Sequence, residues 1–474
     1  KSELLTLPNF KQKLILLGTF VLLCGISLFL IPKMGNIKSK NIFAQEIQAN
    51  GFPKFVDAFT HSELDYFQFY STIDQSVAEK NFLQQFQPPT LVRKITPKSP
   101  ELKKNVVLIS IESLSAEFLE HYGNTQKITP FIDSLANKSL LFTNLYATGN
   151  RTVRGLEALT LCIPPTAGES IVKRENNKKK FSTGSVFKAK GYDVKFLYGG
   201  YSYFDNMEDF YKGNGYDIVD RNNFKPEEIT FANVWGVSDE DMAKKAIEVM
   251  NAEAKSGKPF FNQWMTVSNH RPFTYPDGRI DIPGTAKSRE GGVKYTDYSL
   301  RKFFEMAKKQ DWYKNTVFVI VADHCASSAG KTELPMDKYR IPGMIFSEGF
   351  IQPQEFNQLM SQIDIMPTLF GLLNFNYESK FLGQDVFSPS FQPKAYIATY
   401  QDLGLIKDDY LTVISTNKKV KQYQLKMQRS ALPENFKLFY DEIPMKQLKN
   451  NLVEETISTY QATSYWLKNN KLNQ

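Results

Sequence analysis

Cysteine is scarce in this chain of 474 residues, which contains only three. Cys24 lies in a long apolar run near the N-terminus, so only Cys162 and Cys325 are left for the rest of the chain. This number excludes a disulfide framework, and we expect these two cysteines to be unpaired. Histidine is also scarce, with four residues, so a histidine at the end of a predicted strand carries information.

Internal repeats, low-complexity segments, zinc-finger spacings and the aromatic-basic motifs of nucleic-acid binding are missing as well. We therefore do not expect nucleic acid as a partner. The net charge of +8 is partly local, with basic residues at positions 173–174 and 178–180. These positions form either a solvated loop or a basic patch near a membrane. A hydrophobic content of 42% suffices for a large buried core and a smaller appended unit.

An uninterrupted apolar run without a charge covers residues 14–31. At 1.5 Å per residue a helix of this length spans about 27 Å, close to the thickness of a bilayer core. A signal peptide or a buried core helix would have the same composition, but no small-residue cleavage site follows. We predict a membrane anchor, whose orientation stays open because lysines flank it on both sides. Since the chain begins with Lys1, we expect a fragment or a processed product, with further spans possible upstream.

Four regions differ in composition. The predicted order is a transmembrane helix with its flanks (1–35), juxtamembrane helices and a proline-rich linker (36–104), a catalytic domain (105–400) and a C-terminal subdomain (401–474). In the last region, alternating segments at 410–415 and 420–425 predict a β-hairpin, and residues 454–468 predict an amphipathic helix.

The catalytic region alternates short apolar β-branched runs with helical patterns. The runs cover residues 106–111, 194–198, 259–267 and 316–322, and the helical patterns cover residues 130–136, 185–190, 239–254 and 297–309. This alternation predicts a doubly wound, mostly parallel α/β sheet with a small C-terminal α+β subdomain. Ligands of such sheets bind at the carboxyl ends of the strands. Several polar side chains fall there: Glu112, Tyr198, His270, Asp323 and His324.

Four residues could together hold a metal ion against a nucleophile. Glu112 and Asp323 would supply charge and His324 a nitrogen, a donor set that suits manganese, magnesium or zinc. Thr152 lies in a turn-like stretch that leads into a helical pattern, so its hydroxyl would stand at a helix N-terminus. Metal contact lowers the pKa of such a hydroxyl. The alternative is that these residues cap loops or are solvated.

Five segments of the sequence resemble a known family. The segments that carry the resemblance are residues 105–113 (NVVLISIES), 128–136 (ITPFIDSLA), 266–273 (TVSNHRPF), 322–324 (ADH) and 363–369 (IDIMPTL). They are similar to the sulfatase-like fold of the alkaline phosphatase superfamily, and within it to the lipoteichoic acid synthase and phosphoglycerol transferase branch. The resemblance implies one divalent metal, usually manganese, held by four residues: Glu112, Thr152, Asp323 and His324.

The chain departs from the family patterns in two places. Sulfatases proper have a Cys/Ser-x-Pro-x-Arg motif where this chain has Thr152-Val153-Arg154, which argues against sulfate-ester hydrolysis. Lipoteichoic acid synthases carry a histidine, a tryptophan and an arginine where our alignment has Tyr198, Asp205 and Met207. Asp205 either favours an ammonium-bearing head group or caps the helix predicted at 206–211. A phosphoethanolamine transferase is therefore the alternative, although three cysteines count against that subfamily.

The resemblance implies that Thr152 attacks an anionic phospholipid and passes its head group, through a phosphothreonine, to a glycan or glycerol-phosphate acceptor. His270 would transfer the protons, since the pKa of imidazole lies near the working pH. Arg154 and Lys331 would clamp phosphoryl oxygens or be solvated, and Cys325 would serve packing. By family analogy, the catalytic domain faces the periplasm or the outside of a bacterial cytoplasmic membrane. A phosphodiesterase or phosphatase, and a non-catalytic binding protein, remain as alternatives.

Overall fold

The computed structural model describes residues 9–34, 64–327, 330, 332–429 and 438–474. The chain divides into two compact units, Lys1–Leu64 and Asp65–Gln474. The described part of the first unit contains helix α1 (Phe10–Met34), whose apolar side chains are exposed up to residue 26. Among the described residues it is the one helix long and apolar enough to cross a membrane. Residues 55–59, within the predicted juxtamembrane helices, lie outside the described part.

The second unit is built on a nine-stranded sheet with the order β10-β3-β8-β7-β2-β6-β4-β5, and β9 also pairs with β3. Its strands are β2 (Asn105–Ile111), β3 (Leu140–Tyr146), β4 (Asp193–Tyr198), β5 (Asp217–Val219), β6 (Phe260–Met265), β7 (Thr316–Ala322), β8 (Arg340–Phe346), β9 (Gln354–Phe356) and β10 (Met360–Ser361). All pairings are parallel except those of β8 with β3 and β7. The predicted mostly parallel α/β sheet is thus confirmed.

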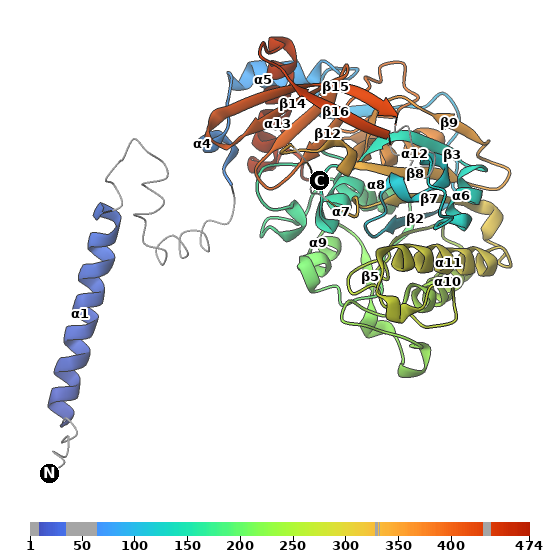
Figure 1. Cartoon of the computed structure of the whole chain (residues 1–474), viewed down its shortest axis with the longest axis horizontal. Coiled ribbons are helices and arrows are strands. Elements are labelled where there is room, and N and C mark those ends of the chain that lie inside the picture. The colour runs from blue at the N-terminus through green and yellow to red at the C-terminus, as the bar shows by residue number, and fades with distance from the viewer. Residues whose placement is uncertain (1–8, 35–63, 328–329, 331, 430–437) are drawn as a thin grey trace. The chain divides into compact units, whose positions relative to one another are not determined.

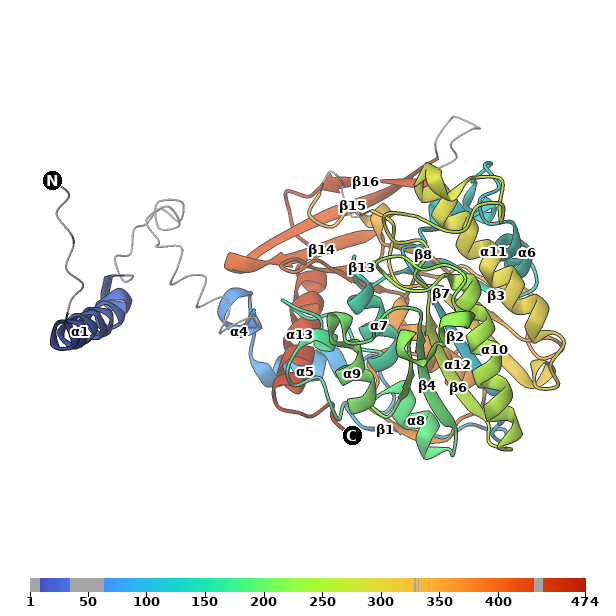
Figure 2. The same cartoon turned by 90° about the horizontal axis from the view of Figure 1, so that it is seen from below.

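Helices cover both faces of this sheet (Figures 1 and 2). They are α6 (Pro130–Ala136), α7 (Thr152–Leu161), α8 (Thr183–Ala189), α9 (Met207–Gly213), α10 (Asp239–Lys255), α11 (Arg289–Ala307) and α12 (Ile365–Leu372). α11 begins about two turns before the helix predicted at 297–309. The Ser288 hydroxyl caps it by accepting from the Gly291 N–H, and the two glycines at 291–292 hide this start in the sequence.

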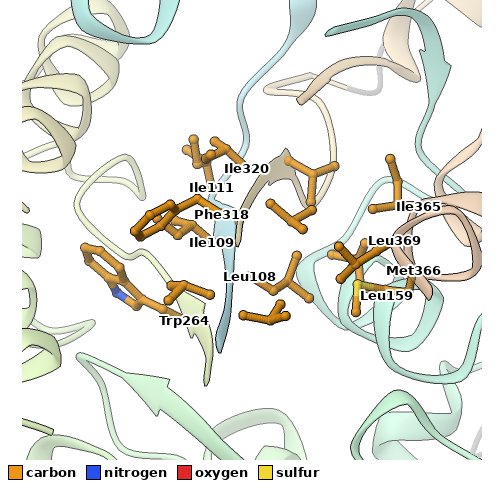
Figure 3. Packing of buried hydrophobic residues seen from close by; sticks show 14 of the residues in the cluster. Leu108, Ile109, Ile111, Leu159, Trp264, Phe318, Ile320, Ile365, Met366 and Leu369 are labelled. Atoms are coloured by element: carbon orange, nitrogen blue, oxygen red, sulfur yellow. The ribbon is translucent and has the colours of Figure 1, made fainter. Parts of the chain in front are cut away.

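The central strand β2 is buried along its whole length, between β6 and β7. Figure 3 shows Ile109 and Ile111 on one side of it with Trp264 and Phe318, while Leu108 on the other side faces the Leu159 and Met366 side of the core. Apolar packing on both faces explains why this strand is a continuous apolar run. The polar residues that follow it come at the edge of the sheet.

A second, antiparallel sheet of five strands forms the C-terminal part. Its strands are β12 (Ala395–Ala398), β13 (Leu403–Lys407), β14 (Tyr410–Ser415), β15 (Lys419–Arg429) and β16 (Leu438–Pro444). The predicted hairpin is β14 and β15. The final helix α13 (Asn450–Lys468) begins earlier than predicted and packs on α5 (Gln75–Leu83), which follows the short helix α4 (Tyr66–Phe69).

Part of the stretch predicted as an extended linker is a strand. β1 (Arg93–Ile95) pairs with β11 (Tyr377–Ser379) in an antiparallel sheet of two strands. Arg93 is buried, with its guanidinium donating to the Thr90 and Leu91 carbonyls and stacking 3.9 Å from the Phe86 ring centroid. Long-range pairing of this kind leaves no local pattern in a proline-rich segment.

Candidate active site

Two parallel neighbouring strands bring the predicted acidic ligands together. Residue 111 of β2 is in register with residue 322 of β7, so Glu112 and Asp323 follow at the same edge of the sheet. The Asp323 N–H donates to the Ile111 carbonyl at 3.1 Å, which continues the ladder to the first residue of the site. Thr152, the first residue of α7, lies at the same edge.

The four side chains form one cluster. Glu112, Asp323 and His324 each offer a donor atom within 4.8 Å of the other two. His324 Nε2 lies 3.7 Å from Glu112 Oε1 and 3.6 Å from Asp323 Oδ2. The Thr152 hydroxyl donates to Glu112 Oε2 at 3.1 Å and lies 3.5 Å from His324 Nε2.

The donor set fits a divalent cation. Asp323 Oδ1 accepts the N–H groups of Ser113 and His324, whereas its buried Oδ2 has no partner among the described residues. Burial raises the pKa of Asp323; the His324 imidazole opposes this shift and the Glu112 charge adds to it. His324 Nδ1 donates to the Cys325 carbonyl at 2.7 Å, which directs Nε2 at the carboxylates. A buried carboxylate oxygen without a hydrogen-bond partner, beside a second carboxylate and an imidazole nitrogen, is what a metal ion would satisfy.

Neighbouring polar groups fix the loops that carry these ligands. Thr266 Oγ1 accepts the Glu112 N–H at 3.0 Å, and the Asn269 amide donates to the Glu112 carbonyl at 2.8 Å. The buried Asp239 carboxylate accepts N–H groups from Val267 and Ser268. Thr266 and Asn269 lie in the 266–273 segment, whereas Asp239 comes from a separate segment, so no local motif joins these supports.

A cavity of about 980 Å³ opens onto the cluster. Among the residues proposed from the sequence, its lining includes Glu112, Thr152, Arg154, Tyr198, Asp205, His270 and His324. Residues 398–400, at the end of β12, also line it, so the C-terminal sheet contributes to the same cavity. Lys331 lies outside the described residues.

His270 stands against an aromatic neighbour that the sequence did not reveal. The His270 ring lies 3.6 Å, centroid to centroid, from that of Trp235. Trp235 Nε1 donates to the Arg271 carbonyl, so the indole is held to the loop of His270. His270 Nδ1 lies 3.2 Å from the same carbonyl, which assigns its proton to Nδ1 and leaves Nε2 for proton exchange.

The contacts of Arg154 contradict the expected role of this side chain as a clamp for phosphoryl oxygens. Its Nη1 lies 3.2 Å from Glu157 Oε1, and its Nη2 donates to the carbonyls of Thr166 and Gly168. Both side chains of the ion pair are buried. Because its donors are used inside the protein, Arg154 holds the segment after α7 in place and is not available as a clamp.

Asp205 does not cap α9. The N-cap residue of that helix is Asn206, without a side-chain cap bond, and Asp205 itself has a left-handed backbone with φ of 51°. Its carboxylate lies 3.3 Å from Lys173 Nζ, which is also 3.9 Å from Glu169.

Burial raises the pKa of the Tyr198 hydroxyl, and the Glu112 charge adds to this shift, so Tyr198 is a neutral donor.

Cations in the lining were also missed by the sequence reasoning. They are Arg151, Lys173, Arg271 and Arg289. Arg289 donates to the carbonyls of Asn269 and Ala326, at 3.2 and 3.3 Å, and thereby bridges two of the site loops. Cys162 and Cys325 are buried and free, as expected, and the Cys325 thiol donates to the Arg340 carbonyl.

Comparison with known proteins identifies the family. The sulfatase family model matches residues 104–375, more than half of the chain. The chain belongs to the sulfatase family. The match covers the strands and helices that supply Glu112, Thr152, Asp323 and His324.

Curated relatives of this sulfatase-family chain include lipoteichoic acid synthases. Lipoteichoic acid synthase 2 of Bacillus subtilis is 25% identical over 312 residues, which are 60% of this chain and 47% of that protein. The lipoteichoic acid synthase of Staphylococcus saprophyticus is 26% identical over 321 residues, 60% of this chain and 48% of that one. The chain thus spans about half the length of the curated relatives that it matches.

Solved structures agree on the fold. A protein of the alkaline phosphatase superfamily from Vibrio parahaemolyticus is 30% identical, with a TM-score of 0.78 over 86% of this chain and 100% of that one. A lipoteichoic acid synthase from Listeria monocytogenes is 22% identical, with a TM-score of 0.61 over 78% of this chain and 93% of that one. The sulfatase fold of the second unit is therefore established, with lipoteichoic acid synthases among its relatives.

Proposed function

We propose that this chain is a membrane-anchored, metal-dependent phosphoglycerol transferase. It takes the head group of an anionic phospholipid, holds it as a phosphothreonine at Thr152, and passes it to a glycan or glycerol-phosphate acceptor of the cell envelope. The observation that carries the proposal is the Thr152 hydroxyl at 3.1 Å from Glu112 and 3.5 Å from His324, in the lining of a cavity of about 980 Å³. The lipoteichoic acid synthases among the relatives support the reaction class.

Glu112, Thr152, Asp323 and His324 would hold the metal, for which manganese is the proposed ion. When bound, the ion supplies a Lewis acid that lowers the pKa of the threonine hydroxyl and balances charge on the phosphoryl oxygens. Glu112 accepts the Thr152 hydroxyl proton in a hydrogen bond and so orients the oxygen. Thr152 heads α7, whose first-turn N–H groups favour an anion in front of them.

The transfer takes two in-line steps. Thr152 gives its hydroxyl proton to Glu112 as Oγ1 bonds to phosphorus, the bond from phosphorus to the diacylglycerol oxygen breaks, and His270 gives that oxygen a proton. In the second step the acceptor hydroxyl returns a proton to His270 and bonds to phosphorus, the Thr152 ester breaks, and Glu112 returns its proton to Thr152 Oγ1. The Nδ1 proton shared with the Arg271 carbonyl keeps His270 Nε2 as the exchanging nitrogen.

The Lys173 partner of Asp205 favours glycerol over ethanolamine as the head group. An unpaired carboxylate in the lining would attract an ammonium group, but this one already has a cation at 3.3 Å. The lining cations Arg151 and Arg271 suit anionic groups. Phosphoethanolamine transfer is the second candidate, and hydrolysis of the same phosphothreonine by water is the third.

The test uses vesicles that contain a phosphatidylglycerol with a fluorescent head group. Thr152→Ala should lower release of diacylglycerol by about 10³-fold or more while the melting temperature stays unchanged. Thr152→Ser is the matched control, because it keeps a hydroxyl. Mass spectrometry of the trapped intermediate should show a glycerol phosphate on Thr152. Unchanged turnover in the alanine variant would refute the mechanism, and free glycerol phosphate as the only product would mean a hydrolase.

The proposed location is a bacterial cytoplasmic membrane, with the catalytic domain on the periplasmic or extracellular side. α1 supports anchoring, since it is apolar over the length of a bilayer core. An anchored enzyme meets its lipid donor at the surface of the membrane.

A further inference from the structure

Apolar side chains are exposed in two loops beside the cavity. Tyr203 is 70% exposed, Val234 82%, Phe204 43% and Tyr201 40%. Single exposed apolar residues are common on proteins, but contiguous groups of them usually mark a contact surface. We call these four residues the aromatic rim.

The aromatic rim is one surface, because its two loops are joined. The Tyr201 and Tyr203 rings lie 5.6 Å apart in a stacked arrangement. Gly199 and Val237 pair the loops through a backbone hydrogen bond of 2.9 Å. Arg221 contacts both loops. Its guanidinium lies 5.3 Å from the Tyr201 ring centroid, and its Nη1 donates to the Asn233 carbonyl at 3.5 Å.

The aromatic rim also continues into the cavity. Phe204 packs edge-on against Trp235 at 5.5 Å, and both side chains line the cavity. Trp235 in turn lies against His270. Tyr201, Tyr203 and Val234 stay outside the lining. These three residues therefore lie next to residues of the lining without lining the cavity themselves.

We propose that the aromatic rim binds a lipid surface and thereby holds the opening of the cavity against the membrane. The inference rests on the proposed function, in which the donor is a membrane lipid. Its head group enters the cavity while its acyl chains stay in the bilayer beside Tyr203 and Val234.

The chemistry of the aromatic rim favours lipid over a sugar. Val234 and Phe204 have no hydrogen-bonding side-chain group, as expected for contact with hydrocarbon, and tyrosines are enriched at membrane interfaces. The neighbouring cations Arg221 and Arg271 suit anionic head groups. The same chain also carries α1, which is long and apolar enough to cross a bilayer.

The first experiment places an environment-sensitive fluorophore at the aromatic rim. Tyr203→Cys is made in the full chain with Cys24→Ser; Cys162 and Cys325 are buried, and burial raises the pKa of both thiols. In phosphatidylglycerol vesicles, the label should shift to the blue and be quenched by spin-labelled acyl chains.

Phe387→Cys is the matched control. Phe387 is 44% exposed and packs on Phe356 of β9, at the sheet edge opposite β5. Quenching at position 203 that does not exceed quenching at position 387 would overturn the inference.

The second experiment compares two substrates. Tyr203→Ser with Val234→Ser should lower turnover of vesicle lipid at least fivefold and leave turnover of bis(p-nitrophenyl) phosphate unchanged. An equal fall with both substrates would overturn the inference, because it would mean that these residues only support the site. The inference would also be overturned if the label at position 203 stayed exposed to solvent and the doubly substituted variant were no longer saturated by an oligosaccharide acceptor. That result would mean that the aromatic rim binds a glycan. If the label is quenched but the parent enzyme has no activity on lipid, the proposed function fails and the docking surface stands.

Discussion

At the scale of single residues, we expect Glu112 to determine how strongly the candidate site holds a cation. Glu112→Gln removes one of two carboxylates from the cluster and leaves its volume almost unchanged. We expect manganese affinity to fall by about tenfold or more, equivalent to ~1.4 kcal/mol. The rise of the melting temperature on adding manganese measures this, since a ligand that binds only the folded state stabilises it. Glu120→Gln, at an exposed position, is the control and should keep the full rise.

Lys173 is expected to set the choice of head group through Asp205. Lys173→Ala frees the Asp205 carboxylate, so phosphatidylethanolamine should gain relative to phosphatidylglycerol in competition assays. The pair is partly exposed, so the gain should be modest, up to about fivefold. Lys173→Arg keeps the cation and should keep the preference. An unchanged preference in the alanine variant would show that Asp205 does not take part in selecting the head group.

At the scale of elements, one glycine lets α7 approach the loop of the candidate metal ligands Asp323 and His324. A Cβ atom on Gly155 would lie 2.3 Å from the Asp323 carbonyl oxygen and 2.7 Å from its carbonyl carbon. Both atoms belong to the backbone, so Gly155→Ala must displace the helix that begins with Thr152. We expect a loss of about 1–3 kcal/mol in stability and a large fall in turnover.

Ala158→Gly, in the same helix, is the matched control for this substitution. It should cost about 1 kcal/mol through helix propensity while leaving Thr152 in place. Denaturant melts and lipid turnover of the two variants separate helix stability from helix position. Equal turnover in both would show that the close approach at Gly155 is not needed for activity.

The elements also show why the polar supports were not found from the sequence. The strands at 106–111 and 316–322 follow from apolar runs, and the residues after them lie at the sheet edge as expected. By contrast, Trp235 and Arg289 reach the cavity from a loop and from the start of α11, respectively. Loop paths depend on tertiary contacts, so no periodicity marks these residues.

At the scale of the whole molecule, burial of Asp364 should make stability depend on pH. Its carboxylate accepts the N–H groups of Ser361 and Gln384, and burial raises its pKa to about 7 despite these bonds. Lys394 opposes the shift; two neutral groups, the Cys162 thiol and the Tyr396 hydroxyl, also face Asp364.

Between pH 4 and 7 the folded state keeps a proton on Asp364 that the unfolded state has lost. The free energy of unfolding should therefore fall as pH rises through this window, by up to ~1.4 kcal/mol per pH unit from this group. Asp364→Asn should flatten that fall in denaturant melts recorded from pH 4 to pH 8. Asp311→Asn, at an exposed position, should retain it. Parallel profiles for Asp364→Asn and the unsubstituted chain would contradict the assignment.

The class of the fold and the place of the candidate site residues follow from the amino-acid sequence alone. Apolar runs alternate with amphipathic helices, and parallel strands place the residues at their carboxyl ends along one edge, which brings Glu112 beside Asp323. The partners of the charged side chains, by contrast, depend on the folded chain. Arg154 pairs with Glu157, and Asp205 pairs with Lys173. Strand periodicity is a local property of the sequence, whereas an ion pair depends on which loops meet, and that is set by the packing of the whole chain.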